Sequence, residues 1–180
     1  MEYRARGRVL VVTTRAVFSI LFLLSAGLLG FGYYLEAAGG LAPCPLCLIQ
    51  RLFFGLIGLT SLIGALHNAK LVGVRVYSAL IALFSLAGAI VAGRQVWLQH
   101  LPADQVPVCG PGLSYMLETS PLGEVLLKVL KGSSDCAEVT WRFMGLSIPE
   151  WALAMFGILF LISAVQMFRS AAATRPALRI

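Results

Sequence analysis

The sequence predicts an all-α membrane protein: a bundle of four transmembrane helices with a long outer loop that carries a short amphipathic helix. Of the 180 residues, 59% are hydrophobic and only 12% are charged, and the mean hydropathy is +0.87. A soluble domain of this length rarely has such a composition. The apolar residues gather in four runs, and the chain length suits a single integral membrane domain over residues 1–180.

The four apolar runs lie at about residues 16–35, 48–66, 76–97 and 150–168. Each is close to the ~20 residues that a helix needs to cross about 30 Å of hydrocarbon. The first run is too long for the apolar part of a signal peptide, and no small-x-small cleavage site follows it before the cysteines, so we expect it to be retained as a span. Two outer loops then cover about residues 36–47 and 98–149.

The basic residues predict how these spans are oriented. Most of them flank the spans at the end where both termini lie, where Glu2 is the only acidic residue. Loops rich in Lys and Arg stay on the cytoplasmic side, so we expect a multi-pass protein of a bacterial inner membrane with both termini in the cytoplasm. All four cysteines then face the periplasm, where disulfides persist. The basic residues concerned are Arg4, Arg6, Arg8, Arg15, Lys70, Arg75, Arg169, Arg175 and Arg179.

The second outer loop contains a segment with helical periodicity. In "PLGEVLLKVLK", from Pro121 to Lys131, the apolar residues recur at helical spacing and the charged residues fall elsewhere. The segment is too short to span a membrane. A helix of this kind either lies in the membrane interface with its apolar face down or packs against the rest of the loop, and the sequence leaves both alternatives open.

The stretch "PCPLCLIQR" places two cysteines, Cys44 and Cys47, directly before the second apolar run. A CxxC pair closes a small disulfide ring whose redox potential depends on what stabilises the thiolate. Pro45 suits the start of a helix, and the N-terminus of a helix favours negative charge. Arg51 lies one helical turn beyond Cys47 on the same face. We therefore expect Cys47 to act as a thiolate beside Arg51, and Gln95, late in the third run, to line a polar pocket near the same surface.

Two other interpretations of the cysteines remain open. A zinc site would normally use two CxxC pairs, whereas Cys109 and Cys136 are far apart in the sequence. His100 lies near the outer surface and is a further candidate ligand. Two purely structural disulfides would explain Cys109 and Cys136, but they leave the CxxC pair next to Arg51 unexplained. The alternative to a redox enzyme is thus a non-enzymatic membrane protein with structural disulfides or a cysteine metal site.

Taken in order along the chain, these motifs resemble one known family. "PCPLCLIQR", a later Cys109 and then "SSDCAEVTWRFMGLSIPEW" before the last span are similar to the disulfide-bond formation protein B (DsbB) family. The resemblance covers nearly the whole chain, including four spans, two outer loops and all four cysteines. Members of this family are bacterial inner-membrane thiol oxidases that depend on quinones.

The resemblance implies an electron path. A periplasmic dithiol protein similar to the thioredoxin-like DsbA would attack a Cys109–Cys136 disulfide, with Cys109 forming the mixed disulfide. Electrons would pass by exchange to Cys44–Cys47 and from Cys47 to a quinone, either ubiquinone or menaquinone. The resemblance implies that Arg51 stabilises both the thiolate and a quinone carbonyl. The pairing of the four cysteines is implied by the family alone, since four cysteines allow three pairings.

Overall fold

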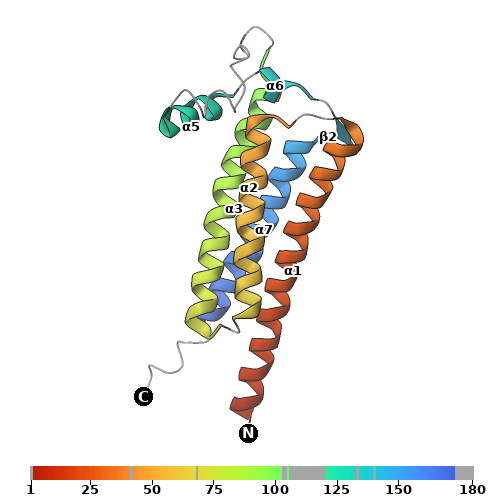
Figure 1. Ribbon diagram of the computed structural model, residues 1–180. Coiled ribbons are helices and arrows are strands. Elements are labelled where there is room, and N and C mark those ends of the chain that lie inside the picture. The colour runs from red at the N-terminus through yellow and green to blue at the C-terminus, as the bar shows by residue number, and fades with distance from the viewer. Residues whose placement is uncertain are drawn as a thin grey trace.

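The computed structural model describes residues 2–40, 43–67, 69–102, 105, 121–132, 134–139 and 141–172. Four long helices form the body of the protein (Figure 1): α1 (Glu2–Gly39), α2 (Pro45–Leu66), α3 (Leu71–Gln99) and α7 (Ile148–Ala172). Each contains a stretch long and apolar enough to cross a membrane, at Thr14–Gly39, Pro45–Leu66, Leu71–Gln99 and Ile148–Ser170. The predicted fold class, a four-helix membrane bundle, is confirmed.

The helices extend beyond the apolar runs that the sequence marks. α1 continues from the first run through Glu36 to Gly39, and α3 begins at Leu71 and ends at Gln99. Alanine, leucine, glutamate and arginine are good helix formers whether or not lipid surrounds them, so hydropathy marks the part of a helix that lies in lipid and not its ends. As a result, the first outer loop is shorter than the predicted segment 36–47, because α1 ends at Gly39 and α2 starts at Pro45.

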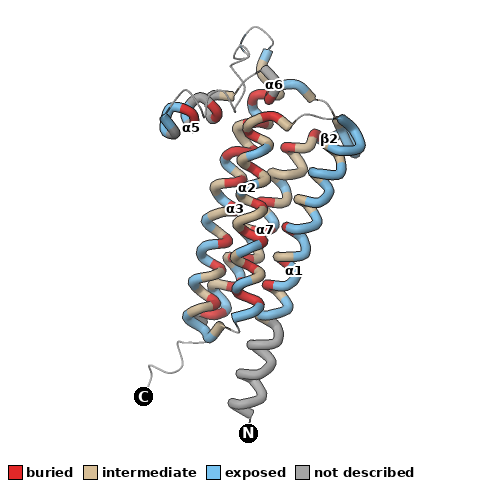
Figure 2. The backbone as a smooth tube through the Cα atoms, in the orientation of Figure 1, coloured by how far each residue is buried: buried red, intermediate tan, exposed pale blue. Residues whose placement is uncertain are grey.

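The helices pack in the order α1–α2–α3–α7 (Figure 1). In the part of the chain that the structure describes, α1 packs chiefly on α2, and α7 packs chiefly on α3. α1 and α7 share little direct packing, so the bundle is not closed on that flank. Among the four candidate spans, Thr14–Gly39 of α1 is correspondingly the most exposed (Figure 2).

The core between the helices is apolar and closely packed. Phe54 of α2 and Phe156 of α7 stack with ring centroids 4.1 Å apart and an interplanar angle of 9°. Phe156 lies directly against Gly88 of α3, where a methyl group in place of the glycine hydrogen would overlap the ring. Small residues at helix interfaces allow this close approach.

The two ends of the bundle differ. α1 begins and α7 ends at one end, together with the turn between α2 and α3 (Figure 1). The other end carries α5 (Leu122–Lys131), the single-turn helix α6 (Ser134–Ala137) and a small hairpin. α5 confirms the predicted short helix. Its buried residues Val125 and Val129 belong to the same apolar cluster as Leu46 and Leu98 of the bundle, while Leu127 is exposed, so one face of α5 packs on the protein.

The hairpin consists of β1 (Arg142–Phe143) and β2 (Leu146–Ser147) in antiparallel pairing. Met144 and Gly145 form its two-residue turn with φ values of 52° and 84°, and two positive φ values are what the favoured type I′ hairpin turn requires. β2 leads directly into α7, where the carboxylate of Glu150 accepts a hydrogen bond from the backbone N–H of Ser147 at 2.6 Å. This is half of a capping box, and it fixes the start of the last helix.

Candidate functional site

The CxxC pair lies at the N-terminus of α2. Cys44 is the N-cap residue and its sulfur accepts a hydrogen bond from the backbone N–H of Cys47 at 3.4 Å. Pro45 follows at the first helical position, where its missing N–H costs nothing. The Sγ atoms of Cys44 and Cys47 are 2.8 Å apart. The two sulfurs therefore face each other across one helical turn, at a helix end whose free N–H groups favour negative charge.

A third cysteine joins this pair. Cys136 of α6 is buried in the same apolar cluster as Cys44. The hydrogen bonds of the Cys44 thiol with Cys136 and with Cys47, together with its burial, hold the pKa of Cys44 well above its usual range. Cys44 thus lies between two possible sulfur partners and is the thiol of the CxxC turn that is held in its protonated form.

Two glutamines complete the polar surroundings of the sulfurs. The Nε2 group of Gln95, on α3, donates to the Sγ of Cys44 at 3.2 Å and to the Sγ of Cys47 at 3.3 Å. Its Oε1 accepts a hydrogen bond from Nε2 of Gln50, on α2, at 2.7 Å. Both glutamines are buried. A buried amide is stable only when its hydrogen bonds are made, and here both ends of the Gln95 amide have partners.

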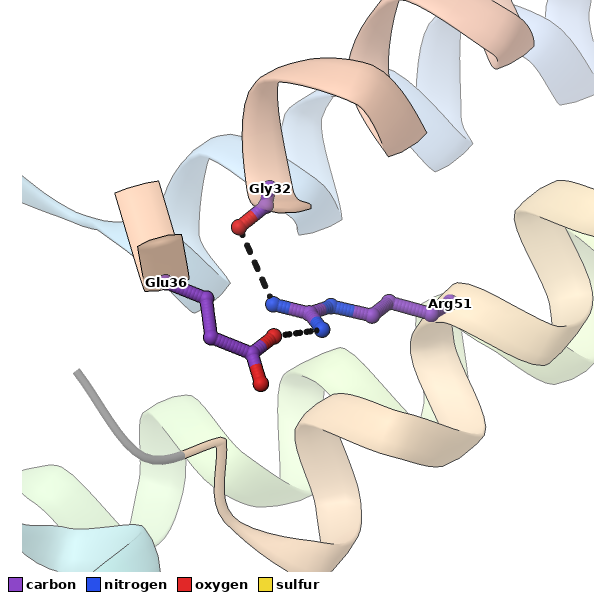
Figure 3. Close-up of polar contacts among 3 residues, drawn as sticks. All are labelled: Gly32, Glu36 and Arg51. Carbon is purple, nitrogen blue, oxygen red and sulfur yellow. Dashed lines mark hydrogen bonds and ion pairs between the residues drawn. The ribbon is translucent and has the colours of Figure 1, made fainter. Parts of the chain in front are cut away.

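Arg51 is turned toward α1 (Figure 3). Its Nη1 lies 2.5 Å from Oε2 of Glu36, and its Nη2 donates to the carbonyl oxygen of Gly32 at 3.1 Å. The guanidinium carbon also lies 4.7 Å from the centre of the Tyr33 ring. These contacts tie α2 to the end of α1. The predicted action of Arg51 on the Cys47 thiolate stays a prediction, because within the described ranges the guanidinium makes its polar contacts with α1.

A cavity of about 630 Å³ opens between these groups. Its lining combines the two sulfurs of Cys44 and Cys47 and the side chains of Gln95 and Arg51 with a larger apolar surface. Binding sites for small molecules commonly have volumes of roughly 300–1,000 Å³ and a mainly apolar lining with few polar groups. The apolar lining comes chiefly from α1 and α7, the two helices that share little packing, and includes Leu28, Leu29, Leu35, Phe54, Ile148, Ala152 and Met155.

Aromatic side chains from the second outer loop cover one side of the cavity. The rings of Trp141 and Phe143 stack with centroids 5.8 Å apart, and Phe31 of α1 meets Trp141 edge-on at 6.2 Å. Trp151 of α7 donates its indole N–H to the carbonyl oxygen of Phe143 at 3.1 Å. All four rings line the cavity, so Trp141 and the hairpin link the C-terminal part of α1 to the start of α7 on this side of the cavity.

The structure brings together five of the six predicted site residues: Cys44, Cys47, Cys136, Arg51 and Gln95 all contribute to the cavity wall or to the sulfur cluster. Cys109 lies outside the described residues. Sequence reasoning missed Glu36 and Gln50 as partners of Arg51 and Gln95. An acid at the end of one predicted span and an arginine at the start of the next could have indicated the Glu36–Arg51 pair. Over the described ranges, no group of three His, Cys, Asp or Glu side chains is placed to hold a metal ion.

The fold and the site define a multi-pass membrane protein with a cluster of cysteine side chains at one end of its bundle. Comparison with known proteins agrees with this class. A family model described as Disulfide bond formation protein DsbB matches residues 14–166, and the chain belongs to this family. The protein is therefore a disulfide-forming membrane oxidoreductase.

Curated relatives match over most of their length. A Disulfide bond formation protein B of Marinobacter nauticus is 51% identical over 158 residues, which cover 88% of this chain and 94% of the relative. A protein of the same description from Hahella chejuensis is 54% identical over 81% of this chain and 88% of its own. Disulfide bond formation protein B 1 of Pseudomonas aeruginosa is 47% identical over 89% of this chain and 99% of its own.

Proposed function

We propose that this protein is a thiol:quinone oxidoreductase that reoxidises a thioredoxin-like dithiol protein, similar to DsbA, on the periplasmic side of a bacterial inner membrane. The observation that carries the proposal is the mainly apolar cavity with two cysteine sulfurs in its wall, next to a third, buried cysteine. Such a site is suited to two kinds of substrate. In this proposal the outer loop receives the protein thiol, and the mainly apolar cavity beside the CxxC pair receives a lipid-soluble acceptor.

The proposed relay starts at Cys109 and Cys136. The dithiol of the protein partner reduces the Cys109–Cys136 disulfide through a mixed disulfide at Cys109, and the partner leaves with its own disulfide formed. The Cys136 thiolate then attacks the Sγ of Cys44. A Cys136–Cys44 bond forms, the Cys44–Cys47 bond breaks, and Cys47 carries away the electron pair. The packing of Cys44 and Cys136 in one buried cluster supports this step, because it brings the attacking and the attacked side chains close together.

The relay is completed within the protein. The Cys109 thiolate attacks Cys136, the Cys109–Cys136 disulfide forms again, and Cys44 is released as a thiol. The raised pKa of Cys44 supports this order, because Cys44 takes up a proton readily while Cys47 remains the more exposed sulfur of the pair. The two electrons of the partner then reside on the Cys44–Cys47 dithiol.

The residues of the cavity fit a quinone headgroup. A quinone bound there would supply the two-electron acceptor that the Cys44–Cys47 dithiol needs, and it would leave as quinol with two protons. The flat apolar ring suits the surface made by Leu28, Leu29, Phe54 and Met155, and a carbonyl oxygen suits a donor of Arg51. A strongly oxidising dithiol protein can be reoxidised only by an acceptor that is more oxidising still, and DsbA with its quinone-linked oxidase is the established example of this relation.

The proposed orientation follows from the charge bias of the sequence. Lys70, directly before α3, and Arg75, in the second turn of α3, lie at the same end of the bundle as the start of α1 and the end of α7 (Figure 1). The positive-inside rule favours the cytoplasm for that end. Cys44, Cys47 and Cys136 at the opposite end would then face the periplasm.

The test is quinone reduction by purified protein, with a reduced thioredoxin-like protein as the electron donor and soluble quinone analogues as acceptors. We expect one quinone reduced for each partner disulfide formed. Partner oxidation without quinone reduction, or no oxidation of the partner at all, would rule out the proposed reaction.

The same sample separates this function from a cysteine metal site. Thiol counting under denaturing conditions should find two disulfides in the resting protein, and metal analysis should find no stoichiometric zinc. Four free thiols with one zinc per chain would favour the metal site, because zinc binds deprotonated cysteines.

A further inference from the structure

Gln95 stands out among the polar residues of the site because it contacts both sulfurs of the CxxC pair. It belongs to α3, whereas Cys44 and Cys47 belong to the start of α2. Its side chain is 3% exposed, and its Nε2 lies 3.2 Å from the Sγ of Cys44 and 3.3 Å from the Sγ of Cys47. A single amino group with two hydrogens therefore serves two sulfur acceptors.

We propose that Gln95 is a catalytic residue of thiol–disulfide exchange, whose amide N–H groups stabilise the thiolate that forms on the CxxC pair, and that Gln50 is the positioning residue that holds this amide in place. The proposal rests on the proposed function and adds to it a donor that acts on sulfur and is distinct from the ligands of a quinone.

The Gln50–Gln95 contact determines which end of the amide faces the sulfurs. Nε2 of Gln50 donates to Oε1 of Gln95 at 2.7 Å, which engages the amide oxygen and leaves the amino group directed at the cysteines. The Sγ of Cys47 lies 3.6 Å from this oxygen and 3.3 Å from the nitrogen, so the donor is the nearer group. With the amide reversed, oxygen lone pairs would face the sulfurs and would repel a thiolate.

The exchange step produces the charge that this donor can stabilise. When the thiolate of Cys136 attacks Cys44, the Cys44–Cys47 bond breaks and its electron pair remains on the Sγ of Cys47. That sulfur is in a site of low polarity, where a negative charge without hydrogen bonds is costly. A preorganised donor already in contact with the leaving sulfur stabilises the charge as it develops. Because Nε2 also contacts Cys44, the same group can act when Cys44 is the leaving sulfur.

The location of Gln50 makes this arrangement specific. Gln50 lies on α2 with the cysteines, one turn beyond Cys47, and it is 5% exposed. Its hydrogen bond crosses from α2 to α3 and sets the amide of Gln95 against the sulfurs. An apolar residue of the same length at position 50 would leave the fold of α2 unchanged but would free the Gln95 amide to turn.

The test uses the quinone-free protein in a Cys109→Ser/Cys136→Ser background, so that Cys44–Cys47 is the only disulfide. Dithiothreitol reduces this disulfide, and the rate is followed by quenching with acid and counting thiols. Gln95→Met keeps the length of the side chain and removes the donor; we expect it to slow exchange by about tenfold or more, since hydrogen bonds to charged groups are the strong ones. Gln50→Met should slow exchange by a smaller factor.

Gln166→Met is the matched control, because Gln166 is a buried glutamine in α7 outside the cavity lining. This variant should undergo exchange at the parent rate.

Quinone kinetics in the protein that retains all four cysteines separate a role of Gln95 in thiol–disulfide exchange from a role in quinone binding. The proposal expects Gln95→Met to lower turnover with a nearly unchanged apparent KM for quinone. A raised KM with an unchanged exchange rate would make Gln95 a quinone ligand only and would overturn the proposal, as would parent-like exchange in Gln95→Met. If Gln95→Met does not fold, Gln50→Met decides: slower exchange at an unchanged melting temperature supports the proposal, and parent-like exchange refutes it. A wild-type protein that exchanges thiols but does not reduce quinone would instead refute the proposed function.

Discussion

Arg51 and Glu36 form an ion pair, with Nη1 2.5 Å from Oε2, that joins the first turns of α2 to the last turns of α1. Both residues line the cavity. The pair compensates a positive charge at the edge of the membrane and fixes the guanidinium in the cavity wall. The side chains are 18% and 37% exposed, so water reaches the carboxylate more easily than the guanidinium.

The two members of this pair should respond differently to mutation. Arg51→Ala removes the donors that we assign to a quinone carbonyl, and each charge-assisted hydrogen bond contributes roughly 1.5–3 kcal/mol. The apparent KM for quinone should therefore rise about ten- to a hundredfold, with the affinity for the protein partner unchanged. Arg51→Lys keeps the positive charge but lacks the planar guanidinium, and it should retain part of the activity.

Glu36→Gln is the matched control. The amide oxygen of this variant still accepts a hydrogen bond from Arg51. The carboxylate charge, which competes with a quinone carbonyl for the guanidinium, is removed, so the apparent KM for quinone should not rise. Unchanged quinone kinetics in Arg51→Ala would show that Arg51 serves only to anchor α2 at the interface.

The relay predicts separate defects for two cysteines. Cys109→Ser should block oxidation of the protein partner, yet Cys44–Cys47 should still transfer electrons from a small dithiol to quinone. Cys47→Ser should abolish quinone reduction from every donor. Both variants are assayed with both donors at matched protein levels. Equal losses in the two assays would contradict a relay of two cysteine pairs, and loss of folded protein in both variants would point to structural disulfides.

The raised pKa of Cys44 predicts how the reduced protein reacts with alkylating agents. Because the thiolate is the reactive form, Cys44 should stay largely unmodified as the pH rises through about 8.5, where an ordinary cysteine ionises. Iodoacetamide at a pH of about 8 should therefore label Cys47 before Cys44, and fragmentation of the labelled peptide by mass spectrometry locates the label. Cys136→Ala removes the hydrogen bond that contributes most to the raised pKa, so it should speed labelling of Cys44. Preferential labelling of Cys44 in the unmutated protein would contradict this description of the pair.

The proposed orientation predicts which cysteines a membrane-impermeant reagent can reach. In a variant that keeps only Cys109, this cysteine should be labelled in intact spheroplasts. A cysteine introduced at Lys70 should be labelled only after lysis. If Cys109 is reached only after lysis, the orientation is reversed.

The contact between Gly88 and Phe156 predicts a position that cannot accept a side chain. The Cβ of Gly88→Ala would overlap the ring of Phe156, which is itself stacked on Phe54. Overpacking of this kind costs about 1–3 kcal/mol, and the melting temperature in detergent should fall. Gly27→Ala is the control, since a Cβ at Gly27 meets no atom within 4 Å, and alanine is the better helix former. A Gly88→Ala protein as stable as the parent would mean that α3 and α7 can separate without cost.

Sequence reasoning predicted the four spans, the short helix α5 and the CxxC turn at the start of α2, because hydropathy, helical periodicity and cysteine spacing are local signals. It did not predict the hairpin from Arg142 to Ser147, whose two-residue strands are too short to show alternation. Nor did it predict the partners Glu36 and Gln50, since these contacts depend on which faces of three helices meet. The approach of Cys136 to Cys44, which are far apart in the chain, likewise depends on where α6 lies above the bundle.

The flank between α1 and α7, where the two helices share little packing, affects how the concentration of a lipid-soluble substrate should be expressed for this protein. A lipid-soluble substrate that enters the apolar cavity from this side comes from the surrounding bilayer or micelle, and its occupancy follows its mole fraction in that phase. Doubling the detergent at a fixed total amount of quinone halves this mole fraction and should double a Michaelis constant expressed per litre of solution. Constants measured at different detergent loads become comparable only when they are expressed per mole of amphiphile. By contrast, the constant for a water-soluble dithiol should not depend on the amount of detergent.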